Sequence, residues 1–244
     1  MGVAHLCGDA VYQVSDPTPS TTAPVTPEEL AVTLAAEAAQ IGLDLPAATL
    51  PRLAAYASRL WAWNERLNLT RHTDACRFLQ RDVADANALQ GHLNAGERIL
   101  DVGTGGGVPG VLLAILRPDL TVELSDSVGK RARAVAAITQ EIDLPLTVHD
   151  QAAQQVVAAA AADGQPFDTL VARAVAPLTK LLTWFEPLVD SYGRLLLIKG
   201  PRWEAEKADA RHRGLLKRVT ARRLAAWPIP GGETESVLLE VCRR

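Results

Sequence analysis

The segment from Arg98 to Leu116 constrains this chain most, because an apolar run, a glycine-rich turn and a second apolar run follow one another directly. The residues Arg98–Val102 predict a buried strand, and those from Val111 to Leu116 predict a helix. Four glycines stand within positions 103–107, which is more than a tight turn needs. Glycine admits positive φ and lets a ligand approach the peptide groups, and a helix start offers unpaired N–H donors. We therefore expect a strand–turn–helix unit against which a nucleotide-like ligand lies.

The glycine pattern alone does not identify the ligand. Gly105, Gly107 and Gly110 satisfy the G-x-G-x-x-G pattern of dinucleotide sites. Asp126, which ends the next apolar run, suits the ribose diol of either a nicotinamide or an S-adenosylmethionine site. Asp101 discriminates between the two, because a carboxylate beside the turn attracts the ammonium and sulfonium groups of S-adenosylmethionine and repels a pyrophosphate. We expect S-adenosylmethionine as the cofactor.

From Glu97 onward the apolar pattern alternates between strand and helix spacing, which predicts a parallel sheet with right-handed crossovers. The last two predicted strands are close in sequence and should form an antiparallel hairpin around the turn from Pro228 to Thr234. The fold class predicted is Rossmann-like α/β, a class I S-adenosylmethionine-dependent methyltransferase with a seven-stranded, mostly parallel sheet. The seven strands are expected at Arg98–Val102, Thr121–Ser125, Leu146–His149, Thr169–Ala172, Arg194–Lys199, Arg218–Trp227 and Ser236–Val241.

Composition divides the chain into three parts. Residues 1–26 are rich in Ser, Thr and Pro, and we expect them to form a disordered tail. Residues 27–94 predict a small helical N-terminal domain, and residues 95–244 the methyltransferase domain. Within the helical domain, helices are expected at Leu30–Ile41 with its N-cap at Thr26, at Pro46–Leu67 and at Thr73–His92.

Cysteine spacing, hydropathy and charge narrow the function classes. Cys7, Cys76 and Cys242 are far apart without a histidine set, so we expect neither a metal site nor a disulfide framework. No apolar run approaches the ~18 residues of a membrane helix, and no export signal is evident, which predicts a cytoplasmic protein without a membrane partner. The net charge is −3, but residues 194–223 hold ten Lys or Arg and three Asp or Glu, a local charge of +7. This local excess favours a polyanionic partner.

Five motifs in order and spacing resemble those of the RsmG (GidB) family over about Pro27 to Val241. They are Trp63-Asn64 with Leu67-Asn68-Leu69-Thr70, Asp101 to Gly110, Asp126-Ser127 with Lys130-Arg131, Arg173-Ala174, and Lys199-Gly200. The resemblance implies a bacterial methyltransferase that uses S-adenosylmethionine to methylate N7 of a guanine in 16S ribosomal RNA, guanine 527 in the numbering of that RNA. It implies 16S ribosomal RNA or a small-subunit assembly intermediate as the partner, and we expect a monomer.

The resemblance also implies which residues contact the cofactor. It assigns contacts to the glycine turn, to two residues after the third strand and to the arginine after the fourth, while Asp101 and Asp126 come from the residue chemistry given above. The expected cofactor-binding residues are Asp101, Gly103, Gly105, Val108, Asp126, Ala153, Gln154 and Arg173. Two segments depart from the family pattern: Ala152-Ala153-Gln154 replaces Arg-x-Glu, and Arg81-Asp82-Val-Ala-Asp85-Ala86 replaces Arg-His-x-x-Asp-Ser.

Methylation of a guanine N7 requires no general base, because this nitrogen has an in-plane lone pair at neutral pH. We therefore expect no catalytic acid or base, and catalysis by positioning and exclusion of water. Cations at the carboxyl ends of the strands should hold the RNA phosphates. The expected RNA-binding residues are Lys130, Arg131, Arg173, Lys199 and Arg202.

Two other functions stay open at this point. A nicotinamide-dependent oxidoreductase shares the glycine turn, but the chain offers no evident proton donor such as Tyr-x-x-x-Lys. A non-catalytic RNA-binding relative with a degenerate cofactor site is the stronger alternative, because of the departures at Ala152 and Asp82. Calorimetric titration with S-adenosylmethionine and NAD distinguishes the three.

Overall fold

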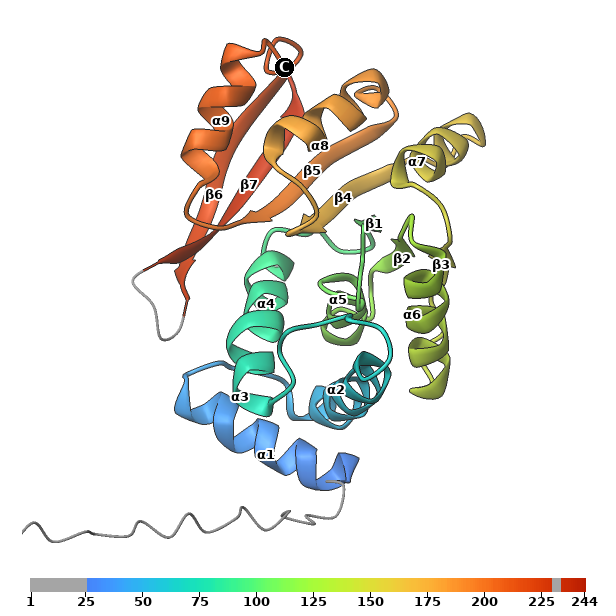
Figure 1. The fold of residues 1–244 in the computed structure, drawn as a ribbon, viewed down its shortest axis with the longest axis vertical. Coiled ribbons are helices and arrows are strands. Elements are labelled where there is room, and N and C mark those ends of the chain that lie inside the picture. The colour runs from blue at the N-terminus through green and yellow to red at the C-terminus, as the bar shows by residue number, and fades with distance from the viewer. Residues whose placement is uncertain (1–25, 230–233) are drawn as a thin grey trace, which may run out of the picture.

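A seven-stranded sheet organises the computed structural model, which describes residues 26–229 and 234–244 (Figure 1). The strand order is β3-β2-β1-β4-β5-β7-β6, and β1, β2, β3, β4 and β5 are mutually parallel. Their bounds are β1 Arg98–Val102, β2 Thr121–Ser125, β3 Thr147–His149, β4 Phe167–Arg173, β5 Tyr192–Lys199, β6 Val219–Pro228 and β7 Glu235–Arg243. The predicted seven-stranded, mostly parallel α/β fold is confirmed.

The two last strands form the predicted antiparallel hairpin. Strand β7 runs antiparallel to β5, with Leu197 opposite Leu239, and β6 runs antiparallel to β7, with Trp227 opposite Ser236. The register shifts at a bulge between Arg223 and Ala225. Part of the predicted connecting turn, residues 230–233, lies outside the described residues, as does the predicted tail at residues 1–25.

Alternate residues of β1, β4, β5 and β7 face two separate apolar cores, as the pleat requires. Ile99 of β1 packs into one core and its neighbour Leu100 into the other. Helices α7 (Ala153–Ala162), α8 (Leu178–Phe185) and α9 (Trp203–His212) cover one face of the sheet. Helices α5 (Gly110–Leu116) and α6 (Gly129–Glu141) cover the other face, together with the helices that precede the sheet (Figure 1).

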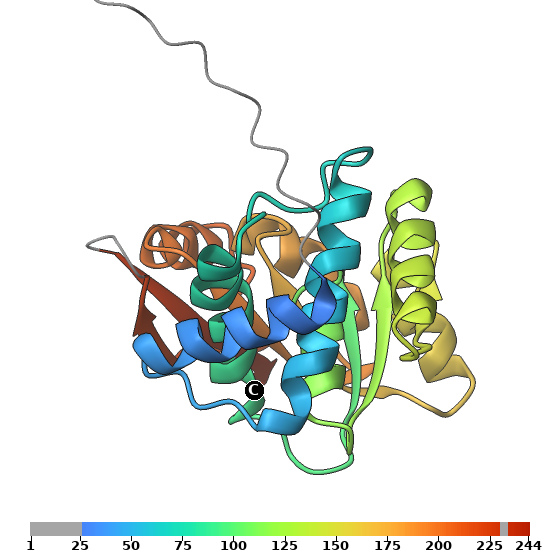
Figure 2. The same ribbon diagram turned by 90° about the horizontal axis from the view of Figure 1, so that it is seen from below.

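The helices that precede the sheet largely follow the sequence prediction. Helix α1 (Pro27–Gln40) begins with the predicted cap, because Thr26 Oγ1 accepts a hydrogen bond from Glu29 N at 3.2 Å. The second predicted helix divides into η1 (Ala47–Thr49) and α2 (Leu50–Asn64). The third consists of α3 (Ala75–Arg77), a π-helical segment η2 (Phe78–Val83) and α4 (Ala84–Gln90). In Figure 2, α1 lies in front of the other helices on this face.

Helix α2 ends three residues before the predicted end at Leu67. The side chain of Asn64 accounts for this end, because its Oδ1 accepts hydrogen bonds from Leu69 N at 2.7 Å and Thr70 N at 2.9 Å. These bonds satisfy backbone donors of a turn in place of a further helical turn. The side chain thereby directs the chain back toward the sheet.

The helical segment and the sheet share one apolar core. Leu34, Leu53 and Leu89 from the helices belong to the same buried cluster as Ile99 and Leu124 from the strands. The hydroxyl of Tyr56, which is fully buried, donates a hydrogen bond to Gly106 O at 2.8 Å. The helical segment is therefore packed directly against the glycine turn. Its status as a separate domain stays a prediction.

Across residues 26–229 and 234–244, the helices are all too short or too polar to cross a lipid bilayer.

The Tyr56 hydrogen bond gives a test of this packing. We expect Tyr56→Phe to lower the free energy of unfolding by about 1–3 kcal/mol, because it leaves the buried Gly106 carbonyl without this donor. Urea denaturation followed by circular dichroism measures the change. Tyr192→Phe is the matched control, since within the described residues the Tyr192 hydroxyl has no hydrogen-bond partner, and we expect a loss below about 0.5 kcal/mol. Equal losses in the two variants would contradict the assigned role of Tyr56.

Candidate active site

The chain reverses its direction of travel across the sheet at β1. From β1 it continues to β2 and β3 on one side, and it then returns to place β4 on the other side of β1. In open α/β sheets, ligands bind outside the carboxyl ends of the strands, at the point where the strand order reverses in this way. Asp101, Asp126 and Arg173 stand at the carboxyl ends of β1, β2 and β4. The structure therefore brings these three predicted site residues to one edge of the sheet.

The glycines of the turn serve two different purposes. A Cβ atom added to Gly107 would lie 2.6 Å from Val111 Cγ2, and one on Gly106 would lie 2.9 Å from Leu60 Cδ1. These glycines are required for internal packing. Gly105 differs, because its added Cβ would meet no described atom closer than Gly103 O at 4.0 Å, and its φ is +59°. Gly105 is the glycine whose surroundings leave room for a ligand beside the backbone.

The predicted residue Gly103 faces the chain after β4. A Cβ atom there would lie 3.0 Å from both methyl groups of Val175, so this glycine permits close contact between the ends of β1 and β4. Val108, which was also predicted to contact the cofactor, is half-buried and packs against the core below the turn. Cofactor contacts by both residues stay predictions.

Asp101 is fully buried and accepts hydrogen bonds from both ends of the glycine turn. Its Oδ2 accepts hydrogen bonds from Thr104 Oγ1 at 2.6 Å and from Gly110 N at 2.9 Å. Its Oδ1 is buried without a hydrogen-bond partner among the described residues. Burial raises the pKa of Asp101 to about 6, although the two hydrogen bonds act in the opposite direction. A buried carboxylate oxygen without a partner fits the positive charge of the ligand expected from the sequence.

Asp126 connects the end of β2 to the same turn. Its Oδ2 accepts a hydrogen bond from Gly105 N at 3.0 Å, and its Oδ1 accepts one from Val128 N at 2.8 Å. The residue is 5% exposed. Each carboxylate oxygen has a second lone pair, so these backbone bonds leave acceptor capacity for a ribose diol. The sequence analysis missed this structural role of Asp126, and its predicted contact with the ribose stays untested.

Ala153 and Gln154 begin α7, close to the end of β3. Ala153 is buried and Gln154 is half-buried. The first N–H groups of a helix have no partner within the helix, so the start of α7 offers donors to an adenine-like ring. The start of α7 follows the end of β3, which lies beside Asp126, since Asp126 N donates to His149 O at 3.1 Å.

Arg173 is held by acidic residues of the helical segment. Its Nη2 lies 2.5 Å from Asp82 Oδ1, its Nη1 lies 3.0 Å from Asp85 Oδ2, and Nη1 also donates to Arg81 O at 3.2 Å. Burial acts to lower the pKa of Arg173, but the charges of Asp82 and Asp85 outweigh it and the pKa is raised. Because its charge is already balanced, no contact in the structure supports the predicted role of Arg173 in binding RNA phosphates, which stays untested.

Two further side chains complete this buried network. His72 Nδ1 lies 2.8 Å from Asp82 Oδ1, and Trp227 Nε1 donates to Asp85 Oδ1 at 2.9 Å. Asp82 Oδ2 is buried without a hydrogen-bond partner among the described residues. The sequence analysis noted Asp82 only as a departure from the family pattern. Its position between Phe78 and Ala86 on the buried face of the helix is the signal that could have predicted a cationic partner.

The predicted RNA-binding cations divide into paired and unpaired groups. Lys199 Nζ lies 2.6 Å from Glu206 Oε2 and donates to Ala176 O at 2.9 Å, and its side chain is 9% exposed. The sequence analysis missed this ion pair, so the proposed phosphate contact of Lys199 has no support from the geometry. Lys130, Arg131 and Arg202 have no ion pair within the described residues, and Lys130 and Arg202 are exposed.

The Arg173 network predicts a strong effect on stability. We expect Arg173→Met to lower the free energy of unfolding by about 3–5 kcal/mol, because it leaves two buried carboxylates without their cation. Thermal and urea denaturation measure the loss. Adding Asp82→Asn and Asp85→Asn to this variant should recover part of it. As a control, Arg218→Gln removes an exposed pair with Asp190 and should cost less than about 1 kcal/mol. A loss below 1 kcal/mol in Arg173→Met would contradict the assignment.

Comparison with solved structures supports the fold. The structure is similar to that of MtNAS in complex with MTA and tNA, with a TM-score of 0.50 and 16% sequence identity over 79% of this chain and 72% of that chain. A mutant of MtNAS gives a TM-score of 0.51 and 18% identity over 89% of this chain and 82% of that chain. Together with the sheet order, these similarities show a class I methyltransferase fold.

Comparison of sequences is more specific. The chain is 42% identical over 190 residues to ribosomal RNA small subunit methyltransferase G of Rhodopirellula baltica, covering 78% of this chain and 80% of the relative. The protein of the same name from Yersinia enterocolitica is 34% identical over 200 residues, covering 82% of this chain and 93% of the relative. The model of the GidB family, described as rRNA small subunit methyltransferase G, matches residues 49–227. The chain therefore belongs to the GidB family of ribosomal RNA small subunit methyltransferase G proteins, as its motifs predicted.

Proposed function

We propose that this protein transfers a methyl group from S-adenosylmethionine to N7 of a guanine in 16S ribosomal RNA, at guanine 527 in the numbering of that RNA. The observation that carries the proposal is the arrangement of Asp101, the glycine turn and Asp126 at the carboxyl ends of β1 and β2, where the strand order reverses, in a chain of this family. The substrate is 16S ribosomal RNA or a small-subunit assembly intermediate, and the protein acts as a monomer in the cytoplasm.

The residues present fit S-adenosylmethionine. Asp101 would face its ammonium and sulfonium groups, and Asp126 would accept hydrogen bonds from its ribose. Gly105 leaves the backbone accessible, and the start of α7 would contact the adenine. When bound, the cofactor supplies a methyl group on a positively charged sulfur. A pyrophosphate would be repelled at the same place by Asp101, which disfavours a nicotinamide-dependent oxidoreductase.

The proposed reaction requires no acid or base from the protein. Guanine N7 carries a lone pair that is free at neutral pH, so the protein needs only to align this atom with the methyl group and exclude water. The buried carboxylates Asp101 and Asp126 are each fixed by backbone or side-chain hydrogen bonds. Groups that are fixed before binding need no reorganisation during the reaction.

The RNA contact near the site rests on Lys130, Arg131 and Arg202. Lys130 and Arg131 lie in the first turn of α6, after β2, and Arg202 precedes α9, after β5. All three follow carboxyl ends of parallel strands, the edge that also carries Asp101 and Asp126. Their charges are therefore positioned to hold RNA phosphates around the proposed site of methyl transfer.

A non-catalytic RNA-binding relative is the second candidate, and one observation favours it. Asp82 and Asp85 bind Arg173 beside the proposed site, and Asp82 stands where the family pattern has histidine. If this buried network had replaced catalytic function, the protein would bind RNA without methylating it. Methylation assays separate the two candidates.

The direct test is methylation of small subunits that lack the modification. We expect the purified protein to transfer one labelled methyl group from S-adenosylmethionine to 16S ribosomal RNA, and mass mapping to place it on a guanine as 7-methylguanine. Isothermal titration calorimetry should show binding of S-adenosylmethionine and none of NAD. Tight binding of NAD alone would overturn the proposal, and binding of neither with retained RNA affinity would favour the non-catalytic relative.

Asp126 gives a first prediction within the site. We expect Asp126→Ala to abolish measurable binding of S-adenosylmethionine, because it removes both the ribose acceptor and the bond that fixes Gly105 N. Calorimetry measures the affinity, and circular dichroism checks that the variant is folded. Asp119→Ala is the control, since Asp119 is exposed and pairs with Arg117 at the opposite end of β2. Unchanged affinity in Asp126→Ala would show that the ribose lies elsewhere.

The raised pKa of Asp101 predicts that cofactor binding depends on pH. Because a cationic ligand favours the ionised carboxylate and the free protein protonates Asp101 near pH 6, affinity should fall as the pH drops through 6. We expect binding of S-adenosylmethionine to be about tenfold weaker at pH 5 than at pH 7. Calorimetric titrations across this range measure the effect. Asp101→Asn should bind weakly at both pH values, and a wild-type affinity that is constant over the range would contradict the proposal.

A further inference from the structure

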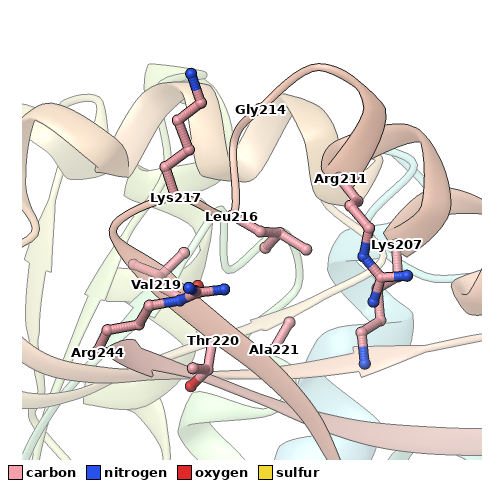
Figure 3. A pocket seen from close by; sticks show the side chains of 9 residues that line it. All are labelled: Lys207, Arg211, Gly214, Leu216, Lys217, Val219, Thr220, Ala221 and Arg244. Carbon is pink, nitrogen blue, oxygen red and sulfur yellow. The ribbon is translucent and has the colours of Figure 1, made fainter.

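A second concentration of positive charge lies away from the proposed active site. Four cationic side chains surround a cavity of about 420 Å³ between α9, the following turn, β6 and the end of the chain. They are Lys207, Arg211, Lys217 and Arg244, and we call this cavity the basic pocket (Figure 3). Buried apolar side chains, including Leu216 and Val219, lie among its lining residues.

The basic pocket lies at the edge of the sheet opposite the glycine turn. Val219 at the start of β6 pairs with Arg243 at the end of β7, and Cys242 of β7 pairs with Arg194 near the start of β5. The pocket is therefore close to the amino end of β5, whereas the proposed site lies at the carboxyl ends of the parallel strands. A nine-residue strand such as β7 spans roughly 25 Å, so the two regions are separate.

The cations of the pocket differ from their neighbours in having no acidic partners. Nearby arginines are paired: Arg213 with Asp209 at 2.9 Å, and Arg218 and Arg243 with Asp190 at 2.8 and 2.7 Å. The four pocket cations have no ion pair among the described residues, and no Asp or Glu lines the cavity. Four like charges around one cavity repel one another, and binding an anion relieves this repulsion.

The residues that line the pocket favour RNA among anionic ligands. Leu216, Val219 and Ala221 are at most 9% exposed and supply an apolar surface between the charges. Such a surface suits a ribose or base, while the surrounding cations suit its flanking phosphates. Amphipathic surfaces that insert into a membrane carry exposed apolar side chains beside the charges. The large exposed apolar residues in the described part of the chain are Val32, Ile41 and Val128, and none of them lines the pocket.

We propose that the basic pocket binds the sugar–phosphate backbone of the RNA substrate, as a second contact remote from the site of methyl transfer. The identity of that RNA rests on the proposed function. Because the two regions lie at opposite edges of the sheet, a folded RNA domain can reach both, whereas a short oligonucleotide at the methyl-transfer site cannot. The pocket thus accounts for selection of a structured RNA by a protein whose net charge is −3.

Salt dependence of RNA binding tests this proposal. The pocket variant combines Lys207→Gln, Arg211→Gln and Lys217→Gln. None of these side chains forms an ion pair within residues 26–229 and 234–244. The matched control combines Arg213→Gln, Arg218→Gln and Arg243→Gln, which removes the same formal charge from exposed, paired arginines. Fluorescence anisotropy with a folded fragment of 16S ribosomal RNA, measured at several KCl concentrations, gives the slope of log affinity against log salt. Calorimetry with S-adenosylmethionine checks that the cofactor site is intact.

We expect the pocket variant to show a slope less steep than wild type by about 2–3, since each lost phosphate contact removes about 0.7–0.9. The control should keep the wild-type slope, and both variants should keep the wild-type affinity for S-adenosylmethionine. Equal slopes in all three proteins would overturn the proposal. Equal flattening in the pocket variant and the control would also overturn it, because binding would then follow net charge and not the pocket.

Two further measurements separate this proposal from the others. If the wild-type protein does not methylate guanine N7 but the pocket variant still shows the flatter slope, the proposed function fails and the pocket stands. If the wild-type protein methylates guanine N7 but the pocket variant keeps the wild-type salt slope, the proposed function stands and the pocket proposal fails. Binding to vesicles that contain phosphatidylserine is the second measurement: binding to them in preference to RNA, lost in the pocket variant, would overturn RNA as the ligand.

Discussion

The glycine turn depends on two buried carboxylates that accept hydrogen bonds from its backbone. Asp101 binds the start of α5 through Gly110 N, and Asp126 binds the middle of the turn through Gly105 N. Both carboxylates stand at the ends of neighbouring parallel strands, so the strand pairing itself sets the shape of the turn. A site fixed in this way is organised before any ligand binds, which is the condition under which positioning alone contributes most to catalysis. This internal bonding leaves Oδ1 of Asp101 without a partner among the described residues.

The helices before the sheet also contribute side chains that hold the site in place. Tyr56 contacts the turn, and Asp82 and Asp85 bind the arginine that ends β4. Truncating the helical segment would therefore expose one face of the sheet and leave Arg173 without its partners. Burying these charges is costly unless each is paired, so the network fixes one arrangement of helices against strands. This gives the departure from the family pattern at Asp82 a physical role.

Ion pairing decides which of the many basic residues are available to an anion. Lys199 follows a buried strand at the expected edge of the sheet, yet Glu206 neutralises it. Lys130 and Arg202 stand at the same edge without such partners among residues 26–229 and 234–244, and the basic pocket holds further cations of this kind at the opposite edge. Sequence gives the local charge of +7 but not this division. Unpaired cations of the described residues therefore stand at both ends of the parallel strands, in a protein whose net charge is −3.

The sequence by itself determined the sheet, the glycine turn and the family. Strand periodicity and glycine spacing are local signals, so β1 and β2 occupy the predicted residues and Asp101 and Asp126 lie beside the turn. Only the tertiary structure decided what each charged side chain contacts. Arg173 meets Asp82 across ninety-one positions of sequence, and Trp227 meets Asp85 across 142. Such pairs depend on the packing of helices against strands, because burial forces each charge to find a partner while the sequence pattern specifies only which face is buried.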